Sequence, residues 1–292
     1  MNPLTLYESG LSTGAVSLSG LFEHKFAAAK SEISTQMLLD AVCRGGWPEA
    51  VALPVSDAQI LIREYMRLTL TESVPRQGKD PDVARRLLDS LARNISQAVT
   101  FKTLRKDMYG TEENLDDFIS ERTVSGYTAM FENMFVIDPI KGWVPPARDP
   151  KRLQTKACRY FADPSIAAAM LGMSPAALIG DWQTFGFLFE NLCIRDLLVY
   201  ARSLLDIGIE PVRYYRDDSG LECDAIIELS DGRWGGIEIK SSEDKVPEAS
   251  ANLCRLKDKL LRNPSARTRE PEFLAVLVGV GEFAYQRMME CM

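Results

Sequence analysis

In the last third of the chain, the alternation of hydrophobic and polar positions is typical of an α/β domain. Apolar residues between Thr184 and Leu204 recur at helical spacing and predict a long helix. Short apolar runs follow, separated by hairpin-type turns at 217–220 and 231–232, and these runs predict strands. The predicted elements are a helix at 184–204, strands at 212–216, 224–229 and 236–240, a helix at 247–261 and a buried strand at 273–280. This region therefore has the order α-β-β-β-α-β.

The first two thirds of the chain are predicted to be mainly helical. Ser17, Ser56 and Thr111 stand where N-caps are expected, because a side-chain oxygen there satisfies a free amide of the first helical turn. The predicted helices cover 18–22, 34–42, 57–73, 81–93, 100–107 and 111–133, and strands follow at 134–139 and 153–161. Three helices followed by a hairpin is the element order of a winged helix-turn-helix.

Composition places the protein among ordinary globular chains. Of its 292 residues, 46% are hydrophobic and 26% are charged. No apolar run reaches the roughly 18 residues that a membrane helix needs. Residues 1–10 have neither the basic nor the apolar region of a signal peptide. We therefore expect a cytoplasmic protein with no membrane partner.

The cysteines and the single histidine argue against several kinds of site. No two of the six cysteines have a CxxC spacing, which disfavours a zinc site and favours reduced, mostly buried thiols. A Ser-His-Asp triad would have to use His24, and nothing near it in the sequence suggests one. We expect His24 to be a surface residue.

Charge is unevenly distributed along the chain. The net charge of −7 disfavours general binding of nucleic acid. However, 85–106, 141–159 and 255–269 each hold six basic residues and one acidic residue, a local charge of +5. The first two segments supply the candidate nucleic-acid contacts Arg105, Lys106, Lys151 and Arg152. The third is either a track for a phosphate backbone or a solvated helix face.

The winged-helix-like region leaves two interpretations open. A DNA-reading helix presents basic or amide side chains in its first turns. The first half of the predicted helix at 111–133 instead carries five acidic residues. The region is therefore either a DNA-binding module or an interaction and packing module of the same shape.

Four residues of the α/β region carry the candidate chemistry. Asp224 begins one predicted strand, and Glu238 and Lys240 lie two positions apart on the next, so their side chains share one face. A hairpin would bring Asp224 beside them. Two carboxylates facing one point suit a hard divalent cation such as Mg²⁺, and Lys240 could position or activate a water there. Glu190, from the preceding helix, would add a further carboxylate, whereas the simpler interpretation is a half-exposed strand with a surface ion pair.

An Asp, a hairpin, a Glu-x-Lys and a preceding helical Glu together resemble the PD-(D/E)xK phosphodiesterase superfamily, which includes archaeal Holliday-junction resolvases. The resemblance implies a restriction-endonuclease-like α/β domain. It also implies that Asp224 and Glu238 are metal ligands for Mg²⁺, that Lys240 is the catalytic lysine and that Glu190 is the helical acidic residue. Many domains of this superfamily look degenerate, but all four residues are present in this chain.

A wider resemblance covers nearly the whole chain. It is to bacterial and archaeal AAA-type ATPases that carry a C-terminal domain of unknown function, in which a P-loop core precedes a winged helix and the nuclease-like domain. Arg44–Pro48 is then either a functional loop of that family or a helix-terminating turn with a packed Trp47. The segments that carry the resemblance are 3–10, 44–49, 122–127, 156–163, 186–191, 222–224 and 238–240.

The chain departs from that family in one important respect. It has no G-x-x-x-x-G-K-[ST] motif, since Gly78-Lys79 is followed by Asp80, and it has no Walker B strand. We therefore expect no ATP site and no ATPase activity. The chain looks like the C-terminal portion of such a protein, either naturally truncated or encoded by a split or mis-started gene. Residues 1–30 would be a remnant of the ATPase core, 31–163 a helical and winged-helix-like domain, and 180–292 the nuclease-like domain.

Two functions remain open at this point. In the first, the protein is nucleic-acid-associated and its nuclease-like domain cleaves phosphodiester bonds with Mg²⁺. In the second, it is a non-catalytic module that binds protein or DNA through a degenerate nuclease fold.

Overall fold

The computed structural model describes residues 2–110, 119–145 and 155–286. The protein is of the mixed α/β class with an open sheet, and it is built of two compact units. Unit 1 comprises residues 1–4, 39–139 and 156–192, and unit 2 comprises residues 5–38, 140–155 and 193–292. The long helix α10 (Trp182–Arg202) contributes residues to both units.

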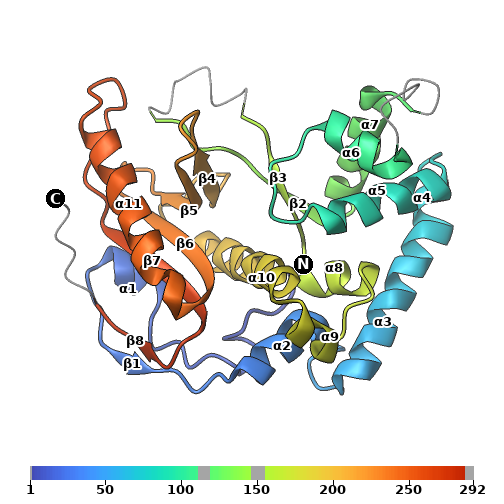
Figure 1. Ribbon diagram of the computed structural model, residues 1–292, viewed down its shortest axis with the longest axis horizontal. Helices are drawn as coiled ribbons and strands as arrows, with labels where there is room; N and C mark the ends of the chain where they lie inside the picture. The colour runs from blue at the N-terminus through green and yellow to red at the C-terminus, as the bar shows by residue number, and fades with distance from the viewer. Residues whose placement is uncertain (1, 111–118, 146–154, 287–292) are drawn as a thin grey trace. The chain divides into compact units, whose positions relative to one another are not determined.

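Unit 1 is mainly helical (Figure 1). Its helix α5 (Pro81–Arg93) has an apolar face that includes the fully buried Leu87 and Leu88. This helix contacts α6 (Phe101–Tyr109), α7 (Glu121–Asn133) and α8 (Pro164–Met170). The strands β2 (Ile137–Ile140) and β3 (Cys158–Phe161) pair with each other. The helical elements are most of α2 (Thr35–Arg44), α3 (Val55–Leu68), a π-helical turn (Thr69–Ser73), α4 (Val74–Arg76), α5 (Pro81–Arg93), α6 (Phe101–Tyr109), α7 (Glu121–Asn133), α8 (Pro164–Met170) and α9 (Pro175–Gly180).

Two predicted helices of this unit differ from the structure. Ser56 is not the cap of α3, because the helix begins at Val55 after Pro54, and the Ser56 hydroxyl instead bonds to Asp57. A continuous helix from Thr111 is also excluded. Thr111 lies outside the described residues, but α7 begins only at Glu121, and its N-cap residue Ser120 has an extended backbone. At Ser56, the presence of a cap-type residue does not by itself determine where the helix begins.

Ser120 provides a direct test of the observed start of α7. Its hydroxyl accepts a hydrogen bond of 3.1 Å from the backbone amide of Thr123. We expect Ser120→Ala to lower the free energy of unfolding by about 1 kcal/mol, because this amide then has no side-chain acceptor at the cap. Ser120→Asn, which keeps an acceptor, should cost less. Chemical denaturation of both variants would measure this, and equal stability of Ser120→Ala and the wild type would contradict it.

The sheet of unit 2 has four strands in the order β4-β5-β6-β7. The strands are β4 (Arg213–Arg216), β5 (Glu222–Glu228), β6 (Trp234–Ser242) and β7 (Phe273–Val280). β5 is antiparallel to both of its neighbours, whereas β6 and β7 are parallel and are connected through the helix α11 (Val246–Leu261). The predicted element order of this region after α10 is thus confirmed.

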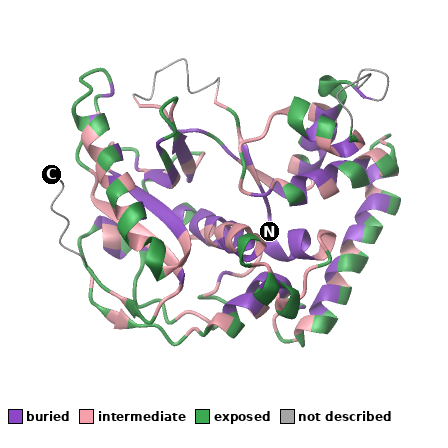
Figure 2. Ribbon diagram, viewed as in Figure 1, coloured by how far each residue is buried: buried purple, intermediate pink, exposed green. Residues whose placement is uncertain are grey.

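Helix α11 covers part of this sheet (Figure 1) and contacts β5, β6 and β7. Leu253, Leu256 and Leu260 recur at helical spacing and are buried in one apolar cluster with Trp143 and Trp234. The other side of α11 is largely exposed (Figure 2), and it carries the charged residues Arg255, Lys259 and Arg262. The helix therefore presents two faces of opposite character.

The remaining elements of unit 2 are small. Helix α1 (Leu18–Phe22) begins at the predicted cap, since the Ser17 hydroxyl accepts from the Gly20 amide. The Phe22 ring packs edge-on against Phe273, with ring centroids 5.0 Å apart. The two-residue strands β1 (Ala29–Lys30) and β8 (Phe283–Ala284) form a separate pair that was not predicted.

The fold also bears on membrane helices and on the state of the cysteines. Within the described ranges, no helix is both long and apolar enough to cross a lipid bilayer.

The described cysteines are thiols and form no disulfide with one another, and Cys43, Cys158 and Cys223 are buried.

Candidate functional site

The candidate site lies on the β5–β6 hairpin of unit 2. Ala225 pairs with Ile237 in the antiparallel register, and continuing this register by one residue places Asp224 opposite Glu238. Lys240 follows Glu238 by two positions on β6, so its side chain is on the same face of the sheet. The hairpin therefore brings Asp224, Glu238 and Lys240 together, as the sequence predicted.

The lysine ammonium contacts both carboxylates of this group. Lys240 Nζ donates to Glu238 Oε2 at 2.6 Å and lies 3.6 Å from Asp224 Oδ2. The same Asp224 oxygen accepts a hydrogen bond of 2.7 Å from the backbone amide of Ile239. This backbone contact fixes the Asp224 carboxylate against β6, which holds the two acids and the base in a defined geometry.

Glu238 is the most buried member of the group. Its side chain is 3% exposed, compared with 18% for Asp224 and 26% for Lys240. Burial, together with the neighbouring Asp224 carboxylate, raises the pKa of Glu238 to about 7, although Lys240 opposes both effects. At neutral pH this carboxyl is therefore poised between its protonated and ionised forms.

The donor set is compatible with a magnesium ion. Mg²⁺ is usually held by one or two carboxylates and keeps several waters, so Asp224 and Glu238 would suffice as protein ligands. A divalent cation would also offset the cost of ionising the buried Glu238 beside Asp224. Among the residues that the structure describes, there is no group of three or more His, Cys, Asp or Glu side chains placed to hold a metal ion.

Glu190 occupies a different setting from the other three. It lies on α10 within unit 1, whereas Asp224, Glu238 and Lys240 belong to unit 2. Its Oε1 accepts a hydrogen bond of 2.7 Å from the hydroxyl of Tyr160 on β3. The next residue, Asn191, is fully buried and bonds both backbone groups of Phe161. The participation of Glu190 in the site stays a prediction.

The residues predicted to contact nucleic acid are not equally placed for that role. Arg105 on α6 is 9% exposed, and its Nη1 donates to the carbonyl of Ile119 at 3.3 Å. This arginine is therefore part of the interior of unit 1 and not of an exposed basic surface. Lys106 on the same helix is exposed. Lys151 and Arg152 lie outside the described residues.

The glycine-rich segment Arg44–Pro48 is a packed turn in this structure. The Gly46 amide donates to Asp163 Oδ2 at 2.9 Å, and Trp47 Nε1 donates to Ser165 Oγ at 3.1 Å. Asp163 is fully buried and caps α8. These contacts support the interpretation as a helix-terminating turn with a packed tryptophan.

His24 is a surface residue, as expected. Its side chain is 67% exposed and its Nε2 lies 2.9 Å from a carboxylate oxygen of Glu272. No serine is among the contacts that the structure gives it, and it is not part of the Asp224–Glu238–Lys240 group.

Two features of unit 2 were missed by sequence reasoning. Cys223, the residue before Asp224, is buried, and its thiol donates to the carbonyl of Ile237 across the hairpin. Asp217, interpreted only as a turn residue, accepts from Lys259 Nζ at 2.5 Å. The second contact joins residues 42 positions apart, so no local pattern could have shown it.

Two family models match the chain. Residues 35–177 match a domain of unknown function, DUF8612, and residues 185–286 match a second one, DUF4143. The second domain typically forms the C-terminal region of AAA-type ATPases. Comparison with curated proteins and with solved structures gave no match. Asp224, Glu238 and Lys240 all lie within the DUF4143 match.

Proposed function

We propose that unit 2 carries a divalent-cation-dependent phosphodiesterase site of the PD-(D/E)xK type that acts on nucleic acid. One observation carries this proposal: Asp224, Glu238 and Lys240 converge on one face of a hairpin, with Glu238 almost completely buried. The order α-β-β-β-α-β around them supports the same fold type. In unit 1, the order of α5, α6, α7, β2 and β3 supports a winged-helix-like module.

The chemistry follows from the positions of these side chains. Asp224 and Glu238 would hold the cation, which when bound supplies Lewis-acid stabilisation of charge on the phosphate. Lys240 would leave its ion pair with Glu238 and orient the attacking water by hydrogen bonding. The water oxygen bonds to phosphorus and the water gives up one proton. The bond from phosphorus to the leaving oxygen breaks, and that oxygen takes up a proton from solvent, so the water supplies overall one hydroxyl and one hydrogen. The backbone contact from Ile239 keeps Asp224 in place throughout.

A calorimetric titration with Mg²⁺ and Mn²⁺ tests the proposal. The wild type should release or absorb heat of binding, and Asp224→Asn with Glu238→Gln should abolish it. Removing the direct ligands should lower the affinity for the cation by more than the roughly 10–100-fold that follows removal of outer-shell partners. A matched control, Glu222→Gln with Asp231→Asn, removes two exposed carboxylates of the same hairpin and should bind as the wild type does.

Cleavage assays on linear and branched DNA then follow for the variants that fold. Binding of the cation without cleavage would contradict the catalytic part of the proposal. Absence of any heat of binding in the wild type would contradict the metal site itself.

A second candidate function, a non-catalytic interaction module, is favoured by the position of Lys240. Its ammonium lies 2.6 Å from Glu238 Oε2 and 3.6 Å from Asp224 Oδ2. Both carboxylates therefore have a cationic partner within the chain, and the three side chains could act only to stabilise the hairpin. The same titration separates the two functions, because a purely structural triad gives no saturable heat with either metal.

A further inference from the structure

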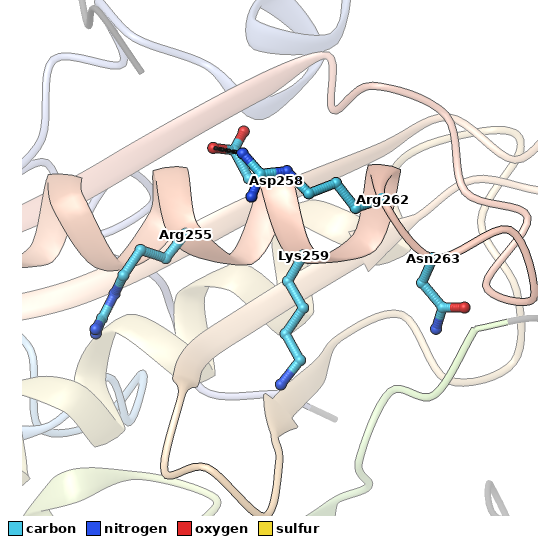
Figure 3. Close-up of a pocket in the computed structure, with 5 residues that line it drawn as sticks. All are labelled: Arg255, Asp258, Lys259, Arg262 and Asn263. Carbon is cyan, nitrogen blue, oxygen red and sulfur yellow. Dashed lines mark ion pairs between the residues drawn. The ribbon is translucent and has the colours of Figure 1, made fainter. Parts of the chain in front are cut away.

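The exposed side of α11 carries a row of cations. Arg255, Lys259 and Arg262 are spaced by four and three residues, so they lie on one face of the helix. All three are exposed, and together with Asp258 and Asn263 they line an open depression on the surface of unit 2 (Figure 3). The opposite face of α11 is the leucine face that packs on the sheet.

The members of this row, here named the α11 basic row (Arg255, Lys259 and Arg262), differ in how they are held. Lys259 Nζ contacts Asp217 Oδ2 at 2.5 Å, which ties the helix to the turn between β4 and β5. Arg262 lies 3.8 Å from Asp258 and is 80% exposed, and Arg255 donates to the side chain of Asn252. Lys259 thus serves as an anchor, and the two arginines keep guanidinium donors toward solvent.

The local charge around this row contrasts with the rest of the chain. Residues 255–269 carry +5, whereas the whole chain carries −7, so the remainder carries −12. Even when Asp217 is counted against Lys259, the segment remains strongly positive. A positive surface on an acidic protein attracts polyanions to one place and repels them elsewhere.

The geometry points to the α11 basic row as the surface that holds the phosphodiester backbone of a nucleic-acid strand. Arg255 and Arg262 are seven residues apart, or about 10 Å along the helix axis at 1.5 Å per residue. A strand of DNA advances about 3.4 Å per nucleotide, so the row spans about three nucleotides. Arginine guanidinium groups match phosphate oxygens in pairs, and Asn263 adds an amide donor at the end of the row.

This inference rests on the proposed function, because it supplies the binding surface for that substrate class. It adds that the surface recognises the sugar-phosphate backbone and not the bases. The side chains that line the depression end in charged or amide groups, and none of them is aromatic. Affinity should therefore depend strongly on salt and weakly on sequence.

The test uses the full chain with Arg255→Gln and Arg262→Gln combined. Glutamine preserves helix propensity and removes two charges. The matched control is Arg63→Gln with Arg67→Gln, which removes two exposed arginines from α3 in unit 1. Binding of fluorescein-labelled single- and double-stranded DNA and RNA is measured by anisotropy in EDTA, over a series of salt concentrations. Thermal unfolding checks that all three proteins are folded.

We expect the α11 variant to bind about tenfold more weakly at low salt, with a salt slope reduced by about 2, one for each guanidinium group removed from a phosphate. The control should bind as the wild type does. Unchanged affinity and slope in the folded α11 variant would overturn the inference. Equal binding of a polyglutamate peptide would also overturn it, because the surface would then be a site for acidic protein.

A further measurement separates this inference from the proposed function. Hydrolysis of bis(p-nitrophenyl) phosphate needs the Asp224–Glu238–Lys240 site but no extended backbone surface. Metal-dependent hydrolysis of this compound with no binding of any oligonucleotide would overturn the α11 surface and leave the phosphodiesterase site standing. Oligonucleotide binding through α11 without hydrolysis of this compound would overturn the phosphodiesterase site and leave the α11 surface standing.

Discussion

Replacing Gly45 by alanine is expected to lower the stability of unit 1 by about 3 to 5 kcal/mol, among the larger effects of a single substitution. Gly45 has a φ angle of +75°, which side chains with a Cβ adopt only at a cost. In addition, a Cβ at this position would lie 2.3 Å from Asp163 Oδ1 and 2.4 Å from Ser165 Oγ. Both residues are buried. The Ser165 hydroxyl donates to Asp163 Oδ1, and the Gly46 amide donates to the other carboxylate oxygen, Asp163 Oδ2, so neither side chain can move without breaking this network.

Gly78→Ala is the matched control for this substitution. Gly78 has a similar φ of +67°, but nothing lies within 4 Å of the position its Cβ would take. Its replacement should therefore cost only the backbone strain, about 1 to 2 kcal/mol. Denaturant unfolding followed by circular dichroism compares the two variants. Equal destabilisation would show that the Asp163–Ser165 network yields readily and would contradict the expectation.

Replacing Glu238 by glutamine is expected to stabilise the protein at pH 8 by about 2 to 3 kcal/mol and to have little effect at pH 4. The folded-state pKa of Glu238 is raised to about 7, above its ordinary value of 4.5. Below pH 4.5 the carboxyl is protonated in both the folded and unfolded states, so burial carries no ionisation cost. As pH rises from 4.5 to 7, the unfolded chain loses the proton first and the free energy of unfolding falls. Above pH 7 the folded protein bears the whole cost of ionising the buried Glu238 carboxyl, and glutamine, which does not ionise, removes this cost.

The comparison between wild type and variant at each pH cancels the titration of groups that do not interact with Glu238. Glu222→Gln, an exposed position on β5, should change stability by less than about 0.5 kcal/mol at either pH. The opposite result, a Glu238→Gln variant that is less stable at pH 8, would show that the ion pair with Lys240 outweighs burial. A bound divalent cation should abolish the gain, so the measurement is made in EDTA.

Much of unit 2 could be predicted from the sequence because its elements are short and its signals are local. The run at Phe273–Val280 is continuous and apolar, and β7 has these same bounds. Alternation in 236–240 predicted the core of β6, and the hairpin turn before it fixed the pairing of Asp224 with Glu238. The proximity of the two carboxylates follows from this register alone.

What could not be predicted depends on contacts between distant segments. The pairing of β1 with β8 joins residues near positions 29 and 284, and each strand has only two residues. Arg105 is buried and donates to the carbonyl of Ile119, fourteen residues along the chain, whereas the basic residues beside it in the sequence made it resemble a surface residue. The contact of Tyr160 with Glu190 is of the same kind. In each case the sequence nearby gives no signal of the partner.

The connection of the sheet also determines the order in which the site is expected to assemble during refolding. β5 and β6 are joined by a short turn at 229–233, whereas β7 pairs with β6 only after segment 243–272, which contains α11, has closed. Because long-range pairing is slowed by the entropy of loop closure, the hairpin should form before the parallel pair. Asp224 and Glu238 would then meet while both are still hydrated. The docking of β7, whose Val276 lies beside Glu238, would complete the burial of that carboxyl. Between pH 4.5 and 7, proton uptake by unit 2 should therefore accompany the formation of the β6–β7 pair and not that of the hairpin.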